Sequence, residues 1–140
     1  MILYEIMCIA MAVYWEARGE PIEGQFAVAE VVVNRMHDPR YPADACSVVY
    51  EADYYPWAPE VPVRHQCQFS FFCDGKSDEP TDYVPWKVAQ LIAAAVYEGR
   101  AAPVIGEATH YHATRVRPDW AATGDVVAKV NDHVFYEGVR

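Results

Sequence analysis

The sequence predicts an α+β fold in which helices come first and a small sheet follows. Helical periodicity dominates the first 36 residues and returns after residue 85. β-branched and aromatic residues gather instead in the last third of the chain. The chain has 140 residues, of which 53% are hydrophobic and 22% charged. These proportions predict one compact domain over residues 1–140.

Two helices are expected at the N-terminal end. The first covers residues 3–18, with apolar side chains at helical spacing and Gly19 placed as its stop. Pro21 opens the second helix, residues 21–36, because a proline at the first helical position loses no hydrogen bond. The segment 26–33 is apolar nearly all round, which predicts that its neighbours enclose it at the centre of the domain.

Regularity fades between residues 41 and 85, where Pro, Asp, Tyr and Gly are frequent. Only CQFSFFC, residues 67–73, alternates in a way that suggests a short strand. Connections of this length are usually functional.

A third helix and two strands are expected to complete the chain. The helix covers residues 85–98 and has Leu91 among its inward side chains. The segments THYHATRV (109–116) and VAKVNDHVFYEG (127–138) have the composition of two short strands joined by a loop.

Four cysteines are present, and their spacing matches no paired CxxC zinc arrangement. Cys8 lies in an apolar helical segment, so we expect a buried thiol there. A disulfide among Cys46, Cys67 and Cys73 remains open.

Composition and charge exclude several function classes. The net charge of -9 argues against nucleic acid, whose phosphates would be repelled. No apolar run reaches the roughly 18 to 20 residues of a membrane span, so none is expected. The first segment carries Glu5 and has no basic region, so we interpret it as a helix and not as a signal peptide. Aromatic residues make up 14% of the chain, which is typical of proteins that present flat rings to sugars.

Glu16 is the candidate catalytic residue. It lies at the end of the first helix, where the helix dipole and two aromatic neighbours favour the protonated carboxyl. Glu20 and Glu23 begin the next helix, where the dipole favours the ionised form. Of the three, Glu16 best suits a general acid. The alternative is that it pairs with Arg18 or another cation at a surface turn.

Five segments resemble, in the same order, the spore-cortex-lytic type of bacterial cell wall hydrolase: EARGEPIEGQFAVAEVVVNR, CSVVY, CQFSFFCDG, ATHYHATRVRPDWA and VNDHVFY. The resemblance covers about residues 10–136. It implies a lysozyme-like fold, mainly helical, with a small antiparallel sheet forming one wall of a groove. It also implies peptidoglycan as the substrate and places the family's catalytic glutamate on Glu16.

The implied chemistry is cleavage of the bond between N-acetylmuramic acid and N-acetylglucosamine. A protonated Glu16 would supply the proton that the glycosidic oxygen needs. Members of this family are similar to lytic transglycosylases, where one carboxylate suffices because the muramic 6-hydroxyl closes on the sugar carbon. The product is then 1,6-anhydromuramic acid. Glu20, Glu23 or Asp74 remain candidates for the second acid that hydrolysis requires. No cofactor and no metal are expected.

The resemblance also points to groove residues. Gln68, Phe69 and Ser70 match the family's Gln-Phe-Ser segment, and Gln68 is suited to hydrogen-bond an acetamido group, although this segment equally suits a structural strand. Tyr111 and His112 match another segment near the groove and are suited to stack on a sugar or orient the leaving oxygen.

Two other function classes stay open. The first is a zinc amidase or peptidase, because His110 and His112 alternate on an expected strand and face the same side. His65, His133 or Cys67 would complete that site. The second is a sugar-binding module that keeps the fold without catalysis.

The chain departs from the family at residues 51–66, a Tyr- and Pro-rich connection without a recognisable counterpart. Tyr54, Tyr55 and Trp57 in it suit a sugar platform or a cap on the core. Without a signal peptide, wall-binding repeat or spore-targeting region, a phage lysis or virion enzyme is the expected setting, and a monomer is favoured.

Overall fold

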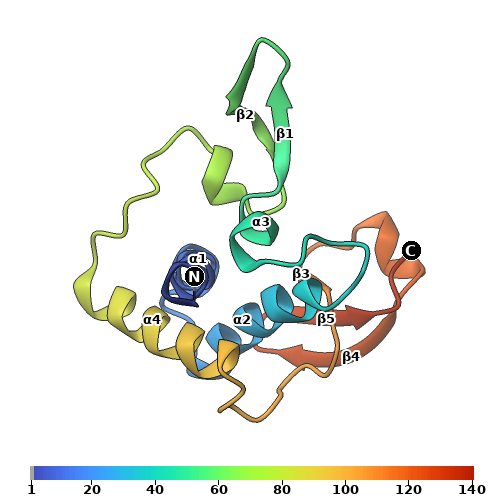
Figure 1. Ribbon diagram of the computed structural model, residues 1–140. Coiled ribbons are helices and arrows are strands. Elements are labelled where there is room, and N and C mark those ends of the chain that lie inside the picture. Colours follow the sequence, from blue (N-terminus) through green and yellow to red (C-terminus); the bar gives the residue numbers. More distant parts are fainter. Residues whose placement is uncertain (1) are drawn as a thin grey trace.

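Four α-helices and two small antiparallel sheets make up residues 2–140, the part of the chain that this computed structural model describes (Figure 1). The helices are α1 (Ile2–Ala17), α2 (Ile22–Met36), α3 (Ala45–Val49) and α4 (Tyr83–Tyr97). The strands are β1 (Ala52–Tyr55), β2 (Ala58–Cys67), β3 (His110–Ala113), β4 (Asp125–Val130) and β5 (His133–Glu137). Short 3-10 helices cover Ser70–Cys73 and Asp119–Ala122. The predicted α+β class, with helices first, is confirmed.

Helix α1 lies at the centre of the helical part and contacts α2, α3 and α4 (Figure 1). Ile9, Val13 and Tyr14 are fully buried, because the helix is covered on several sides. It ends at Ala17, and Gly19 adopts φ +84°, the left-handed conformation that favours glycine after a helix. The predicted end is confirmed within one residue, so Glu16 lies in the last turn.

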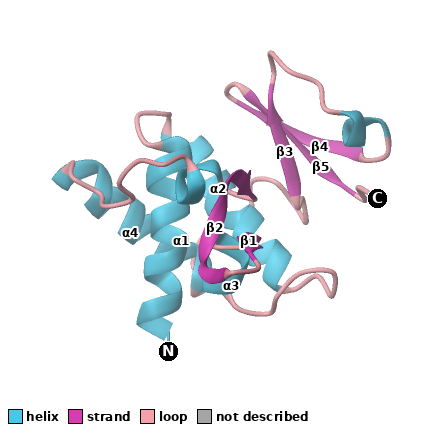
Figure 2. Ribbon diagram, turned by 90° about the horizontal axis from the view of Figure 1, so that it is seen from above, coloured by secondary structure: helices cyan, strands magenta, loops and turns pink. Residues whose placement is uncertain are grey.

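Helix α2 carries two apolar faces that serve two different cores. Val28 and Val32 belong to the larger core, which the helices build. Ala27 and Val31 belong to a smaller core that includes Phe135 of β5. In Figure 2 the three-stranded sheet lies to one side of the helices, with α2 next to it. The expectation that this apolar helix is enclosed by its neighbours is confirmed.

One carboxylate, Glu30, is buried within α2, with 7% of its surface exposed. Its Oε1 accepts hydrogen bonds from the backbone N–H groups of Val104 (2.8 Å) and Ile105 (3.2 Å). Its Oε2 has no hydrogen-bond partner among the described residues. Burial raises the pKa of Glu30, and the two backbone hydrogen bonds oppose this.

The C-terminal sheet has the strand order β3-β5-β4, with both pairs antiparallel. The segment 127–138, expected as one strand, is a hairpin of β4 and β5, so that prediction was wrong. The hairpin turns at Asn131 and Asp132, and Asn131 adopts φ +53°, which asparagine tolerates better than most residues. The two-residue Asn-Asp turn was the signal in the sequence.

The middle of the chain contains a second hairpin, which the sequence did not indicate. Strands β1 and β2 project from the body beyond α3 (Figure 1). Their register shifts twice, β2 contains Pro59 and Pro62, and neither strand has a buried residue. A strand that is exposed on both faces shows no alternation of apolar and polar residues, so the usual pattern is missing.

The expected strand at residues 67–73 is wrong, because Ser70–Cys73 forms a 3-10 helix. A disulfide joins Cys67 to Cys73, whose Cα atoms are 6.2 Å apart. Six residues of extended chain would span roughly 20 Å, so a strand cannot bring these two cysteines together. The alternating phenylalanines reflect a tight turn that buries Phe69 and Phe71.

A second disulfide joins Cys8 of α1 to Cys46 of α3. The expected free thiol at Cys8 was therefore wrong, whereas a disulfide among the other three cysteines is confirmed. Leu91 was also misassigned, because 71% of its surface is exposed while its neighbour Ile92 is buried. Within residues 2–140, no helix has the length and apolar character needed to cross a bilayer.

Candidate active site

A pocket of about 340 Å³ lies where the helical part meets the C-terminal sheet. The last turn of α1 and the end of α2 form one side of it, and β3 with the start of β5 forms the other. Gln68 and Phe69, which follow the projecting hairpin, and Trp120 of the second 3-10 helix complete the lining. The predicted arrangement of a glutamate at a helix end opposite a small sheet is therefore present.

Glu16 reaches this pocket from the last turn of α1. Its Oε1 accepts a hydrogen bond from the hydroxyl of Tyr111, with 3.3 Å between the two oxygens. Burial raises the pKa of Glu16, the Tyr111 hydrogen bond opposes this, and the charge of Glu20 adds to the increase. The carboxyl therefore keeps its proton to higher pH than an exposed glutamate does.

Tyr111 holds its hydroxyl against Glu16 from β3. Its ring stacks on Phe135 of the neighbouring strand, with 5.3 Å between the centroids, and meets His133 edge-on at 5.4 Å. Burial and the nearby Glu16 carboxylate raise the pKa of Tyr111 well above its usual value. The phenol is thus a permanent hydrogen-bond donor to the glutamate at neutral pH.

No second carboxylate lines this pocket within the described chain, where Glu16 is the only acidic residue of the lining. Glu20 lies outside it, with its Oε1 3.4 Å from Nδ1 of His133. Glu23 is exposed in the first turn of α2. Asp74 accepts a hydrogen bond from the backbone of Lys76. None of the three residues considered as a second acid lines the pocket with Glu16.

Four of the five residues expected in the groove line the pocket, and Ser70 does not. Gln68 lines it with an amide oxygen that accepts from Arg35, and Phe69 is 2% exposed and forms part of the helical core. Two hydrogen bonds hold the ring of His112 in place: its Nδ1 bonds the Ala113 carbonyl and its Nε2 bonds the Tyr136 hydroxyl, each at 2.8 Å. The face of the ring is then what His112 offers to the pocket. Ser70 is exposed in the 3-10 helix.

Sequence reasoning missed several lining residues. Arg35 ends the matched helix segment, where its position alone gave no functional signal. His110 and His133 were considered only as metal ligands. Burial, Arg35 and Arg40 lower the pKa of His110 to about 4, so its ring is neutral at physiological pH. Trp120 packs against His110, with 5.0 Å between the ring centroids, and closes that end of the pocket.

The histidines do not assemble into a metal centre. Within residues 2–140 no group of three His, Cys, Asp or Glu side chains is arranged to hold a metal ion. Cys67, considered as a ligand, is bonded to Cys73. Both ring nitrogens of His112 are already engaged by groups of the protein.

Two solved catalytic domains are similar to this architecture. The catalytic domain of the Bacillus cereus SleB protein superposes with a TM-score of 0.70 and 26% identity, over 95% of this chain and 89% of that chain. The catalytic domain of the germination-specific lytic transglycosylase SleB from Bacillus anthracis gives the same score and identity, over 95% and 93%. The α+β fold is therefore lysozyme-like, as the resemblance implied.

Sequence comparisons identify the same group. A spore cortex-lytic enzyme of Bacillus subtilis (strain 168) is 49% identical over 47 residues, which are 34% of this chain and 15% of that protein. One from Halalkalibacterium halodurans is also 49% identical over 47 residues, covering 14% of its length. The chain thus matches only a small part of these relatives. The sequence profile described as Cell Wall Hydrolase matches residues 19–136, beginning three residues after Glu16. The chain belongs to the cell wall hydrolase family.

Proposed function

We propose that this domain degrades peptidoglycan by cleaving the β-1,4 bond between N-acetylmuramic acid and N-acetylglucosamine, as a lytic transglycosylase. The observation that carries the proposal is the single carboxylate of the pocket, Glu16, with its raised pKa and its tyrosine partner. Family membership and the likeness to a domain named as a lytic transglycosylase support it.

In the first step, Glu16 acts as general acid. Its raised pKa keeps a proton available to the glycosidic oxygen, so that the N-acetylglucosamine unit leaves while positive charge develops on the muramic sugar carbon. Burial disfavours the carboxylate form, so the protonated form that the first step requires stays populated to higher pH than in a solvated glutamate. The Tyr111 hydroxyl then stabilises the new carboxylate by its hydrogen bond.

In the second step, the same Glu16 acts as general base. The carboxylate takes the proton of the muramic 6-hydroxyl, whose oxygen closes on the sugar carbon and forms 1,6-anhydromuramic acid. Glu16 ends the cycle protonated, as it began. Because the nucleophile comes from the substrate, no second carboxylate is needed, in agreement with the composition of the lining.

Positioning of the glycan is assigned to the other predicted residues. The side-chain NH₂ of Gln68 has no partner among the described residues and is suited to an acetamido oxygen. Tyr111 and His112 offer ring surface on the β3 side of the pocket, and Phe69 offers an apolar contact. Ser70 remains a proposed contact outside the pocket itself.

Muropeptide mass spectrometry on digested sacculi tests the mechanism. The wild-type chain is expected to release anhydro ends, and Glu16→Gln to release none, because the amide cannot deliver a proton. Glu23→Gln and Asp74→Asn are matched controls that remove a carboxylate outside the pocket and are expected to stay active. Reducing ends from wild type would indicate hydrolysis, and freed stem peptides an amidase. An active Glu16→Gln protein would refute the role of Glu16.

The biological setting is a separate question. The comparisons give no support to a phage enzyme, because the relatives they name are spore cortex-lytic proteins. We propose a role at the bacterial wall, with peptidoglycan as the partner. A single catalytic domain and a monomeric state remain predictions from the sequence. Light scattering of the purified chain tests the monomeric state.

A further inference from the structure

Arg35 is a buried cation without a counter-ion. Its side chain lines the pocket from the end of α2, and 6% of the residue is exposed. Its Nε donates to the carbonyl of Thr109 at 2.8 Å, and one terminal nitrogen donates to Oε1 of Gln68 at 3.3 Å. No ion pair within residues 2–140 involves this guanidinium.

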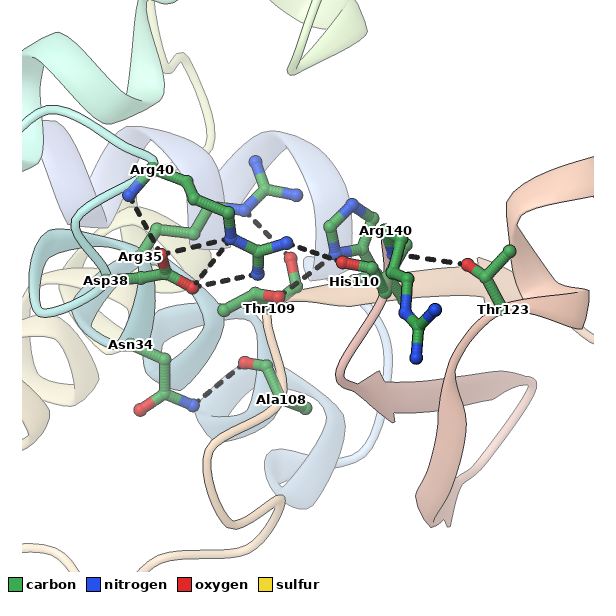
Figure 3. Close-up of polar contacts among 10 residues, drawn as sticks. Asn34, Arg35, Asp38, Arg40, Ala108, Thr109, His110, Thr123 and Arg140 are labelled. Atoms are coloured by element: carbon green, nitrogen blue, oxygen red, sulfur yellow. Dashed lines mark hydrogen bonds and ion pairs between the residues drawn. The ribbon is translucent and has the colours of Figure 1, made fainter.

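The partners that Arg35 does have are neutral. A carbonyl and an amide satisfy two of its five N–H donors, and the rings of Tyr41 and Phe69 lie 5.0 and 5.7 Å from its central carbon. In Figure 3 its terminal nitrogens point away from the nearby pair of Asp38 and Arg40. Buried charges in proteins are normally paired, because an uncompensated one is costly. The pocket thus leaves a place for an anion.

The electrostatics of the pocket favour an anion at this end only. His110 stays uncharged because burial and the cations Arg35 and Arg40 lower its pKa to about 4. Arg40 is neutralised by Asp38 at 2.9 Å, so Arg35 supplies the free positive charge. On the Glu16 side, the charge of Glu20 adds to the raised pKa of Glu16, so negative potential acts on that part of the pocket and disfavours a bound carboxylate there. A ligand with one anionic group is therefore oriented along the pocket.

We propose that Arg35 determines specificity by binding the lactyl carboxylate of a muramic acid unit that carries no stem peptide. This inference rests on the proposed function, since that function supplies the muramic acid. N-acetylglucosamine has no acid group, and the lactyl carboxyl of a peptide-bearing muramic acid is a neutral amide. Arg35 is well suited to a carboxylate, because its planar fork donates two parallel hydrogen bonds. An amidase reaction that removes stem peptides must then supply the preferred substrate.

A matched pair of substrates tests the proposal. Peptide-free glycan strands present free lactyl carboxylates, and the same strands after methyl esterification present neutral esters. Wild type is expected to cleave the acid form with a kcat/KM on the order of tenfold to a hundredfold higher, the factor that one charged hydrogen bond contributes. Arg35→Gln is expected to lower this ratio to near one, and Arg35→Lys to keep part of it. Arg40→Gln, which removes an equal charge outside the pocket, is expected to preserve it.

A purely structural Arg35 would give a different result. Arg35→Gln would then slow both substrates equally and leave their ratio unchanged, which overturns the proposal, as does a wild-type ratio near one. If Arg35→Gln does not fold, the wild-type and Arg35→Lys ratios still decide.

A binding measurement tests the role of Arg35 independently of the proposed cleavage. NMR titration of the Glu16→Gln protein with the disaccharide N-acetylglucosaminyl-N-acetylmuramic acid and with its methyl ester needs no turnover. Tighter binding of the acid supports the role of Arg35 even if the wild-type chain forms no anhydro product. Equal binding of both forms refutes it even if cleavage occurs.

Discussion

Replacing Tyr111 by phenylalanine removes one hydrogen bond from the Glu16 carboxyl and leaves the stacked ring in place. A hydrogen bond to an ionised group contributes about 1.5 to 3 kcal/mol, and the 3.3 Å separation favours the lower end of this range. About 1.4 kcal/mol corresponds to one pH unit. Because the lost bond favoured the carboxylate, the pKa of Glu16 rises further in Tyr111→Phe.

The kcat/KM profile against pH measures this change, because its alkaline limb reports the loss of the general acid's proton. In Tyr111→Phe the limb is expected to move to higher pH by about one unit. The plateau is expected to fall by up to about tenfold, because the carboxylate formed during proton transfer has lost its donor. Soluble glycan strands with chromatographic detection of anhydro ends give the rates.

Tyr136→Phe is the matched control. It removes a hydroxyl from the same sheet, but that hydroxyl bonds His112 and not Glu16. Its alkaline limb is expected to coincide with that of wild type. A limb that stays in place in Tyr111→Phe, or that moves equally in both variants, would refute the assignment of Glu16 as an acid tuned by Tyr111.

Three further predictions concern stability. The pKa of Glu30 is raised in the folded state, so the folded protein holds a proton that the unfolded chain releases, and stability falls as pH rises above 4.5, the ordinary value. Urea midpoints measured from pH 4 to 7 are expected to fall less in Glu30→Gln, and equal slopes would contradict this. The double variant Cys8→Ala, Cys46→Ala is expected to lose about 4 kcal/mol of unfolding free energy relative to oxidised wild type, because the disulfide spans 38 residues. Urea denaturation of both proteins without reductant measures this difference, and equal midpoints would contradict it. Ile92→Ala, with 5% exposure, is expected to lose about 2 to 5 kcal/mol and Leu91→Ala, with 71%, less than about 0.5; equal losses in thermal unfolding would refute the packing described for α4.

Sequence periodicity was sufficient for the three long helices α1, α2 and α4, because each buries a continuous stripe, whereas the five-residue helix α3 was not predicted. Gly19 indicated where α1 ends. The apolar run of α2 indicated a helix enclosed by its neighbours, and in the structure this helix packs in two cores. The hairpin of residues 52–67 was not predictable in this way, since its strands expose both faces. The Cys67–Cys73 disulfide changed the local structure through a covalent bond that periodicity does not encode.

A site residue could be predicted when the signal for it lies in its own segment of the sequence. Glu16 was expected at the site from its own segment, through the helix end and the family motif, and it lines the pocket. Its partner Tyr111 was expected at the groove, but a bond to Glu16 across 95 positions cannot be derived from spacing. Arg35 gave no signal at all, because its importance comes from the absence of a nearby carboxylate, which only the folded arrangement reveals.

The contribution of α2 to two cores bears on how this domain unfolds. One helix contributes Val28 to one apolar cluster and Ala27 to the other, one position apart in the chain. Because α2 packs in both cores, loss of α2 from one core also disturbs the other. The helical part and the C-terminal sheet are therefore expected to unfold together. Heat inactivation, helix content and tryptophan fluorescence should then follow one shared curve.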